Sequence, residues 1–227
     1  MAEFQNHNRE LLTAVVQQID PRTGNATVTI GKVETILPKL EQVPGEELYE
    51  GDHVKVYVVD VKETEKGPKV MISRTHPGLV KRLFETEVPE IFDGTIEIKS
   101  ISRQAGSRTK LAVYSANPDI DPVGACIGQR GARVNTIVEE LKGEKIDIVK
   151  YSEDPVLFIG EALSPAKVVS VEIESENPKV CRVKVPDSQL SLAIGNKGQN
   201  ARLAAKLTGW KIDIRPESGF YGEDTED

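Results

Sequence analysis

The stretch Ile194-Gly195-Asn196-Lys197-Gly198 carries the strongest structural signal in this 227-residue sequence, because two glycines bracket two polar residues between helix-forming segments. The same pattern occurs earlier as Ile127-Gly128-Gln129-Arg130-Gly131. Each copy is followed by a helical pattern, a glycine and, one residue later, the string Lys-Ile-Asp-Ile, at residues 145–148 and 211–214. A turn that is duplicated together with its flanks marks a repeated structural unit.

The segments around the two turns occur in one order. Residues 78–152 read as helix, strand, strand, helix, glycine turn, helix and strand, and residues 153–216 repeat that order. Apolar residues spaced by three and four predict the helices, and period-two alternation predicts the strands. The first of these helices is expected over residues 79–92, weakened near its end by Pro89. The sequence therefore predicts two similar α+β domains, over residues 78–152 and 153–216.

Residues 11–75 have a β pattern, with five short strand candidates separated by turn residues. In the longest, His53–Lys62, Val54 and Val58 share one face, whereas Val59 and Val61 occupy the other. Because period-two alternation otherwise keeps the face constant, this switch predicts a β-bulge. Five short strands, one of them strongly bent, favour a small closed barrel of the OB type.

The two ends of the chain lack such patterns. Residues 1–10 are polar, and residues 217–227 contain five acidic residues and no basic one, so both segments are expected to be disordered. The formal net charge is −7, yet no Asp or Glu lies between Asp187 and Asp213. Four basic residues fall inside this window, namely Lys197, Arg202, Lys206 and Lys211. Such a local basic patch attracts phosphate even on an acidic protein.

A GxxG turn between two helices suits the backbone of a single-stranded nucleic acid. Glycine has no side chain, so a sugar–phosphate chain can approach the peptide closely. The N–H groups and the dipole of the next helix then face the phosphates. The central residues Arg130 and Lys197 add positive charge, and apolar flanks form a groove for unstacked bases. A lone GxxG is a weak signal, but here the whole context is duplicated.

These motifs resemble known RNA-binding domains. Both repeats resemble KH domains of type II order, and the leading barrel resembles the S1 type of OB fold. Their order resembles the RNA-binding core of the NusA family of bacterial transcription factors. The resemblance extends over about residues 11–215, and its closest matches are Lys55–Val61, Ile72–Pro77, Val123–Arg133 and Ala193–Trp210.

The resemblance implies a function in transcription. The chain is expected to bind nascent single-stranded RNA and to modulate pausing, termination and antitermination by RNA polymerase. Other antitermination factors are expected partners, and the location is expected to be cytoplasmic. The family's N-terminal polymerase-binding domain has no counterpart in this sequence. We therefore expect a fragment of a longer protein, with polymerase binding a property of the parent.

The residues expected to contact RNA are those of the two turns and the polar residues that follow them. Arg133 and Arg202 lie two and four residues past their turns, so they face different sides of their helices. We expect Arg202 to contribute more, because other polar residues surround it. The full set is Ile127, Gly128, Gln129, Arg130, Gly131, Arg133, Ile194, Gly195, Asn196, Lys197, Gly198, Asn200, Arg202 and Lys206.

Two further predictions concern aromatic residues. Lys55 and Tyr57 share the outer phase of their strand, where an OB fold stacks a base, so both are candidate RNA contacts in the barrel. Trp210 opens an apolar strand and is expected to be a core residue rather than a stacking platform.

Catalytic chemistry has little support in the sequence. The histidines His7, His53 and His76 lack metal-ligand spacing, and neither a GxSxG elbow nor a Walker A string occurs. Cys126 and Cys181 belong to no CxxC pair and are expected to be buried thiols in a reducing compartment. No apolar run reaches the ~18 residues of a membrane helix. The sequence therefore predicts a non-enzyme without cofactor, metal or membrane partner.

Two other functions are compatible with the same motifs. The chain could be an S1/KH module that delivers RNA to a translation or RNA-decay factor, or a protein scaffold with degenerate RNA sites. Co-purification with RNA polymerase would favour the function in transcription, whereas co-purification with ribosomes or a nuclease would favour the first alternative. Failure to bind any single-stranded oligonucleotide at low salt would favour the second.

Overall fold

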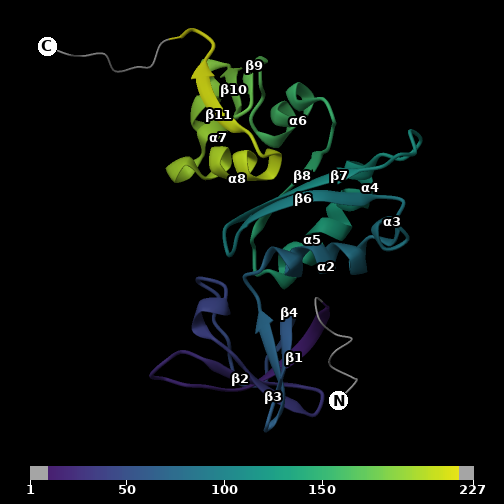
Figure 1. Cartoon of the computed structure of the whole chain (residues 1–227), viewed down its shortest axis with the longest axis vertical. Helices are drawn as coiled ribbons and strands as arrows, with labels where there is room; N and C mark the ends of the chain where they lie inside the picture. The colour runs from purple at the N-terminus through teal and green to yellow at the C-terminus, as the bar shows by residue number, and fades with distance from the viewer. Residues whose placement is uncertain (1–9, 220–227) are drawn as a thin grey trace, which may run out of the picture. The chain divides into compact units, whose positions relative to one another are not determined.

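The structure is a computed structural model that describes residues 10–219, and these divide into two units (Figure 1). Unit 1 contains residues 10–93, 103–108 and 126–145, and unit 2 contains the other described residues. Helices of the first predicted repeat lie mainly in unit 1, whereas most of its strand residues lie in unit 2. The expected disordered ends fall largely on residues 1–9 and 220–227, outside the described part of the chain.

Unit 1 begins with a five-stranded antiparallel sheet in the order β3-β2-β1-β4-β5. Its two outer strands also meet, because Thr35 Oγ1 of β3 donates to Val70 O of β5 at 2.7 Å. Small and β-branched residues such as Ala14, Val28 and Val56 fill its interior. This barrel-like sheet confirms the predicted architecture. Its strands are β1 (Leu11–Ile19), β2 (Ala26–Ile30), β3 (Val33–Leu37), β4 (His53–Thr64) and β5 (Gly67–Ser73).

The predicted bulge lies in β4. The pairing of β4 with β5 shifts register between Val58 and Asp60. Val58 is fully buried, whereas the next residue, Val59, is 38% exposed. After the extra residue, the inward face moves to odd-numbered positions, and Val61 packs against the barrel core, as the sequence pattern indicated.

Three helices complete unit 1, namely α2 (Pro77–Glu87), α3 (Pro89–Phe92) and α5 (Ala132–Glu140). The helix expected over residues 79–92 is two helices, interrupted at Val88, whose backbone is extended at φ −112° and ψ 102°. A residue that precedes proline disfavours the helical conformation, so Pro89 causes the break. At the other end of α2, His76 Nδ1 accepts a hydrogen bond from Gly78 N at 2.8 Å.

A buried arginine attaches α5 to the barrel. The Arg74 side chain is fully buried, and its Nη2 donates to Glu46 Oε2 at 3.0 Å and to Glu140 O at 3.2 Å. Its Nη1 donates to Lys55 O at 2.5 Å. A buried guanidinium needs such partners, because removing one leaves an uncompensated charge. The helix after the first glycine turn is therefore held at its C-terminal end.

Unit 2 contains strands of two three-stranded sheets, in the orders β6-β7-β8 and β11-β10-β9. The strands of the first are β6 (Glu97–Gln104), β7 (Arg108–Tyr114) and β8 (Lys145–Lys150), and those of the second are β9 (Ser170–Glu176), β10 (Lys179–Val185) and β11 (Lys211–Pro216). In the second sheet, β10 pairs antiparallel with β9 and parallel with β11. The helices around these sheets are α4 (Pro122–Ile127), α6 (Pro155–Ala162), α7 (Leu190–Ile194) and α8 (Gln199–Thr208).

The core of unit 2 contains two residues that the sequence analysis singled out. Trp210 is only 7% exposed and packs with Phe158 and Leu207, which confirms its predicted core position. Cys181 is fully buried in the same cluster, and desolvation raises the pKa of its thiol to about 11. Cys126 is also buried and belongs to no disulfide. The Cys181 thiol therefore stays protonated at neutral pH, and Cys181 is a packing residue.

Hydroxyl groups on β6 hold helix α8. Ser102 Oγ donates to Leu203 O at 2.8 Å, and Ser100 Oγ donates to Leu207 O at 2.9 Å. These two serines satisfy main-chain oxygens of α8 directly from the sheet. The middle and the C-terminal end of the helix that follows the second glycine turn are therefore held by a strand of the first repeat.

Candidate nucleic-acid interface

The two GxxG turns share one backbone conformation. The leading glycines Gly128 and Gly195 have φ/ψ of 78°/173° and 80°/171°. The basic residues Arg130 and Lys197 have 54°/29° and 52°/31°. The closing glycines, which precede α5 and α8, agree equally well at 74°/14° and 72°/14°. The repeat inferred from the sequence is thus a repeat in three dimensions.

The basic residue of each turn lies in the left-handed region, where a residue with a side chain costs roughly 1–2 kcal/mol. Within residues 10–219 only Arg130, Lys142 and Lys197 combine a side chain with positive φ. Both Arg130 and Lys197 are exposed to solvent. The turns therefore hold a cationic side chain at the surface in an unfavourable backbone conformation, a feature that is common at binding sites.

The leading and closing glycines meet different surroundings. A Cβ added to Gly195 would lie 2.7 Å from Asn200 N, and one added to Gly128 would lie 2.7 Å from Arg133 Cγ. The fold itself therefore requires these two glycines. A Cβ added to Gly198 would meet no atom within 4 Å. The outer side of this closing glycine is open, which is where the backbone of a ligand can approach the peptide.

Each closing glycine is also the N-cap of the next helix. Gly131 precedes α5 and Gly198 precedes α8, and neither has a side chain to accept from the first-turn N–H groups. These N–H groups and the positive end of the helix dipole favour an anion at this position. The arrangement suits a phosphate group of a nucleic-acid backbone.

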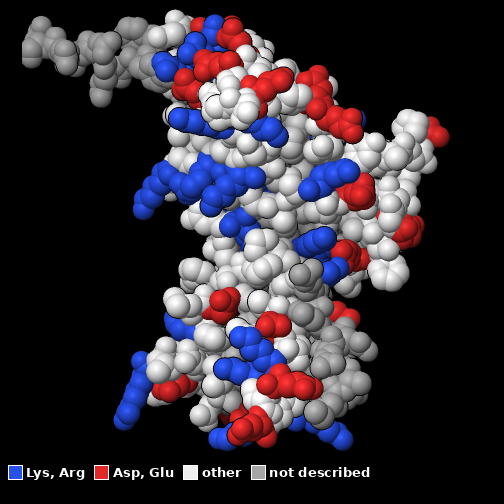
Figure 2. All heavy atoms as spheres, in the orientation of Figure 1, with Lys and Arg blue, Asp and Glu red and all other residues white. Residues whose placement is uncertain are grey.

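Positive charge is concentrated at the second turn. Lys197, Arg202 and Lys206 are exposed, and Figure 2 shows Lys and Arg side chains gathered over the region where Figure 1 places α8. Arg202 Nη1 donates to Lys197 O at 3.1 Å, which brings its guanidinium beside the turn. The RNA contact expected of Arg202 stays a prediction.

The first turn has an acidic neighbour. Arg133 Nη1 lies 3.0 Å from Glu90 Oε2 of α3, and both side chains are about one-third exposed. The carboxylate offsets part of the charge that Arg133 would otherwise offer to a phosphate. Arg130 is therefore the main cationic residue that this turn presents to solvent.

The remaining predicted residues of the turns lie at the surface or partly buried. Gln129 and Asn196 are exposed, Ile127 is 37% exposed, and Ile194 is half-buried. Leu192, which the sequence analysis did not single out, is 44% exposed three residues before Gly195. It adds apolar surface beside the second turn, and its only sequence signal is its place in α7.

Asn200 requires a correction. Its side chain was expected to contact RNA, but the residue is only 3% exposed. Its Nδ2 donates to Leu163 O at 3.0 Å and to Ala193 O at 2.9 Å. The residue faces inward because Gly195 has no side chain and leaves room for it. Asn200 is therefore part of the protein interior beneath the turn.

The candidate contacts in the barrel are also changed by packing. Tyr57 is 7% exposed, and its ring stacks on His76 with the centroids 4.7 Å apart and an interplanar angle of 15°. The segment that enters α2 covers this face, so the ring is not open to a base. The predicted stacking role of Tyr57 is therefore wrong for this structure. Lys55 is half-buried, and its Nζ donates to Thr13 Oγ1 at 2.7 Å.

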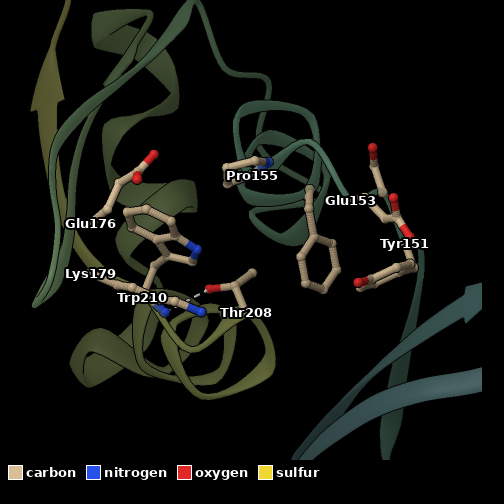
Figure 3. Close-up of a pocket in the computed structure, with 9 residues that line it drawn as sticks. Tyr151, Glu153, Pro155, Glu176, Lys179, Thr208 and Trp210 are labelled. Carbon is tan, nitrogen blue, oxygen red and sulfur yellow. Dashed lines mark hydrogen bonds between the residues drawn. The ribbon is translucent and has the colours of Figure 1, made fainter.

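Unit 2 has a separate hollow beyond the C-terminal end of α8 (Figure 3). It has a volume of about 370 Å³, and Lys179 Nζ lies 5.9 Å from the centroid of the Trp210 ring. The carboxylates of Glu153 and Glu176 also line it. Two carboxylates against one ammonium disfavour a phosphate backbone, so we do not include this hollow in the candidate interface.

Residues 10–219 offer neither a metal site nor a membrane-spanning helix. In this range no group of His, Cys, Asp and Glu side chains is arranged to hold a metal ion. Likewise, none of the helices described here has the length and apolar character needed to cross a membrane.

Three domain families match the chain. An S1 RNA binding domain matches residues 8–73, a NusA-like first KH domain matches residues 74–151, and a NusA-like second KH domain matches residues 155–221. The chain is a NusA homologue. The predicted fold class, an S1-type barrel followed by two KH domains, is thereby confirmed.

Individual NusA proteins are similar to nearly the whole length of this chain. It is 58% identical over 217 residues to the transcription termination/antitermination protein NusA of Halalkalibacterium halodurans, which covers 96% of this chain and 56% of the relative. The NusA protein of Bacillus subtilis is 54% identical over 231 residues, covering 100% and 62%. That of Thermus thermophilus is 48% identical over 210 residues, covering 92% and 54%. The chain thus spans little more than half the length of these relatives, whose names describe transcription factors rather than enzymes.

Proposed function

We propose that the chain is the single-stranded RNA-binding core of a bacterial transcription factor. In the whole protein, this core binds nascent RNA through both GxxG turns and modulates pausing, termination and antitermination by RNA polymerase. The observation that carries the proposal is the duplicated turn, in which Arg130 and Lys197 are exposed at the same left-handed backbone position. The names of the relatives favour transcription over translation or RNA decay.

The chemistry of the second turn suggests how RNA is held. The open side of Gly198 admits the sugar–phosphate backbone, and the first N–H groups of α8 donate hydrogen bonds to a phosphate. The Lys197 ammonium adds charge, and Arg202 extends the positive surface. Bases then lie on the apolar side chains of α7, among them Leu192. The first turn is proposed to bind in the same way through Arg130, with less charge around it.

The proposal also includes the domain bounds of this core and the partners of the full-length protein. We propose an S1 barrel over residues 11–75, a first KH domain over 78–152 and a second over 153–216. RNA polymerase and other antitermination factors are the proposed partners of the full-length protein in the cytoplasm. The KH turns would present RNA to that assembly.

The test is RNA binding by a variant with both cationic residues reversed, Arg130→Asp with Lys197→Asp. A fluorescently labelled single-stranded RNA is titrated at several salt concentrations. We expect affinity to fall more than tenfold, and the slope of log K against log salt to become shallower by about 1.4, because each lost phosphate contact removes about 0.7.

The control has the same change in charge at two residues that belong to neither turn. Lys62→Asp with Lys69→Asp alters two exposed lysines of β4 and β5 in the barrel. This variant should bind within about threefold of wild type, because it changes the net charge equally but leaves the cationic residues of both turns in place. Unchanged affinity in the turn variant, or equal losses in both variants, would contradict the proposal.

A further inference from the structure

A buried polar chain connects the sheet β6-β7-β8 to the second GxxG turn within unit 2. The Lys110 side chain of β7 is fully buried, and its Nζ donates to Asp147 Oδ2 of β8 at 2.9 Å and to Ser164 O at 2.6 Å. The carbonyl next to Ser164, that of Leu163, accepts from Asn200 Nδ2. Side chains of the first repeat therefore reach a segment that supports the second turn.

Asn200 connects that segment to the turn itself. Both hydrogens of its amide are used, since Nδ2 donates to Leu163 O and to Ala193 O, two residues before Gly195. A Cβ at Gly195 would lie 2.8 Å from Asn200 Cβ, so the two residues are in close contact. Asn200 is in the first turn of α8, whereas Ala193 is in α7. The amide therefore sets the spacing of the two helices on either side of the glycine turn.

The chain of contacts is geometrically demanding. A buried ammonium that loses a partner is left uncompensated, which is strongly unfavourable. The positions of Asp147 and Ser164 O around Lys110 are therefore tightly constrained. Through Leu163, the same constraint acts on Asn200 and on the end of α7. Displacing one member shifts the support of the turn, although none of these side chains is at the RNA-facing surface.

We propose that Asn200 and Lys110 are positioning residues for RNA binding by the second turn. They hold α7 and α8 at the spacing that presents Lys197 and the open side of Gly198 to the RNA backbone. This inference rests on the proposed function and adds that the second KH turn depends on β7 and β8 of the first repeat. The first turn differs, because its equivalent position holds Arg133, which pairs with Glu90 at a partly exposed site.

The experiment uses the full chain and two variants that interrupt the connection at different points. Asn200→Ala removes both amide hydrogen bonds, and Lys110→Met removes the ammonium while retaining a long side chain. We expect the affinity for single-stranded RNA to fall about fivefold to tenfold in Asn200→Ala and about threefold in Lys110→Met. Circular dichroism and thermal unfolding verify that each variant is folded under the binding conditions.

A double-mutant cycle separates positioning from a general loss of stability. Each variant is combined with Lys197→Asn and, separately, with Arg130→Asn, because asparagine tolerates the left-handed conformation. We expect Lys110→Met to retain its threefold effect in the Arg130→Asn background and to lose it in the Lys197→Asn background. Residues that act through one site are non-additive in this way. Equal effects in both backgrounds would overturn the inference.

A matched control is Ser102→Ala, which removes the buried bond from Ser102 Oγ to Leu203 O. It weakens the contact between the same sheet and α8 but does not reach the turn. We expect lower thermal stability with RNA affinity within twofold of wild type. A loss in Ser102→Ala as large as that in Lys110→Met would show that the sheet contact in general, and not the Lys110–Asn200 connection, determines binding.

Amide chemical shifts give a readout that needs no RNA. In Lys110→Met, the shifts of Gly195–Gly198 should change, whereas those of Gly128–Gly131 should not. Unperturbed shifts at Gly195–Gly198 would overturn the inference. If the wild-type chain binds no single-stranded RNA, the proposed function fails and the inference fails with it. If the wild type binds but Asn200→Ala and Lys110→Met bind equally well, only the inference fails.

Discussion

The two GxxG turns have nearly identical backbones but different supports. Five residues after the leading glycine, the first turn has Arg133, which pairs with Glu90 in a partly exposed ion pair. The second turn has Asn200 at that position, buried and bonded to two main-chain carbonyls. The same backbone angles therefore occur with two different residues behind the leading glycine, a partly exposed, ion-paired arginine and a buried asparagine. The difference indicates that conformation and support of a binding turn are separable.

The largest expected effect comes from adding a methyl group to the leading glycines. In Gly195→Ala the Cβ would lie 2.7 Å from a backbone nitrogen, Asn200 N, at a φ of +80°. We expect a loss of about 2–4 kcal/mol in the free energy of unfolding, from overpacking and backbone strain together. Gly128→Ala should cost somewhat less, because the Arg133 backbone N would lie 3.0 Å from its Cβ and only the side-chain atom Arg133 Cγ would lie as close as 2.7 Å. Denaturant unfolding measures both.

The comparison has an internal control in the closing glycine of the second turn. Gly198→Ala places its Cβ in open space and adds only the strain of a positive φ, about 1 kcal/mol. The expected order of destabilisation is therefore Gly195→Ala, then Gly128→Ala, then Gly198→Ala. A larger loss for Gly128→Ala than for Gly195→Ala would show that Arg133 is held as rigidly as Asn200.

A smaller effect is expected from the cationic residues taken singly. Lys197→Asn should weaken RNA binding about tenfold and Arg130→Asn about threefold, because the second turn has more positive charge around it and one phosphate contact is lost in each case. Asparagine is tolerated at positive φ, so the turns should keep their shape. Fluorescence anisotropy with a labelled single-stranded RNA measures the two affinities. A greater loss from Arg130→Asn would reverse the ranking of the two turns.

The smallest effect concerns pH and the helices that lead into the two KH domains. His76 Nδ1 caps α2, whereas Asp154 Oδ1 caps α6 by accepting from Val156 N at 3.0 Å. Desolvation lowers the pKa of His76 below 6.5 in the folded protein. The unfolded chain therefore binds this proton more readily, and the stabilisation is complete above pH 6.5 and is lost as the pH falls through the lowered pKa.

Thermal unfolding between pH 7.5 and pH 5 tests this linkage. His76→Asn retains a side-chain oxygen that can accept from Gly78 N but has no proton to gain. We expect the melting temperature of the wild type to fall more steeply over this range than that of His76→Asn. Parallel curves for the two proteins would show that the α2 cap does not respond to pH.

Much of the fold was predictable because its signals are local. Glycine spacing alone indicated both turns, and the structure gives them the same dihedral angles. The change of apolar phase in β4 predicted the bulge at Val59, since a residue's face follows from its number in the strand. The break at Val88 was less clear from the sequence, where Pro89 indicated a weakened helix rather than two.

The site was less predictable because burial depends on residues that are distant in the sequence. Asn200 is a polar residue close to the second turn, as an RNA contact would be, but its side chain lies inward in the space that Gly195 leaves. Tyr57 lies on the predicted outer phase of its strand, but His76 stacks on its ring. In both positions, a neighbouring residue that the hydrophobic periodicity of the sequence does not reveal decides whether the side chain is exposed to solvent. The contacts proposed for the turns remain predictions to be tested by binding.

The sequence by itself determined the order of the domains, the two GxxG turns and the basic window around the second turn. These depend on backbone conformational preferences and on charge, which act over a few residues. Only the tertiary structure decided which polar residues near the turns face solvent and which are buried beneath them. Lysine side chains are usually exposed to solvent, yet that of Lys110 is fully buried against Asp147 and Ser164 O. Its role depends on bringing together segments more than fifty residues apart, for which the sequence contains no local signal.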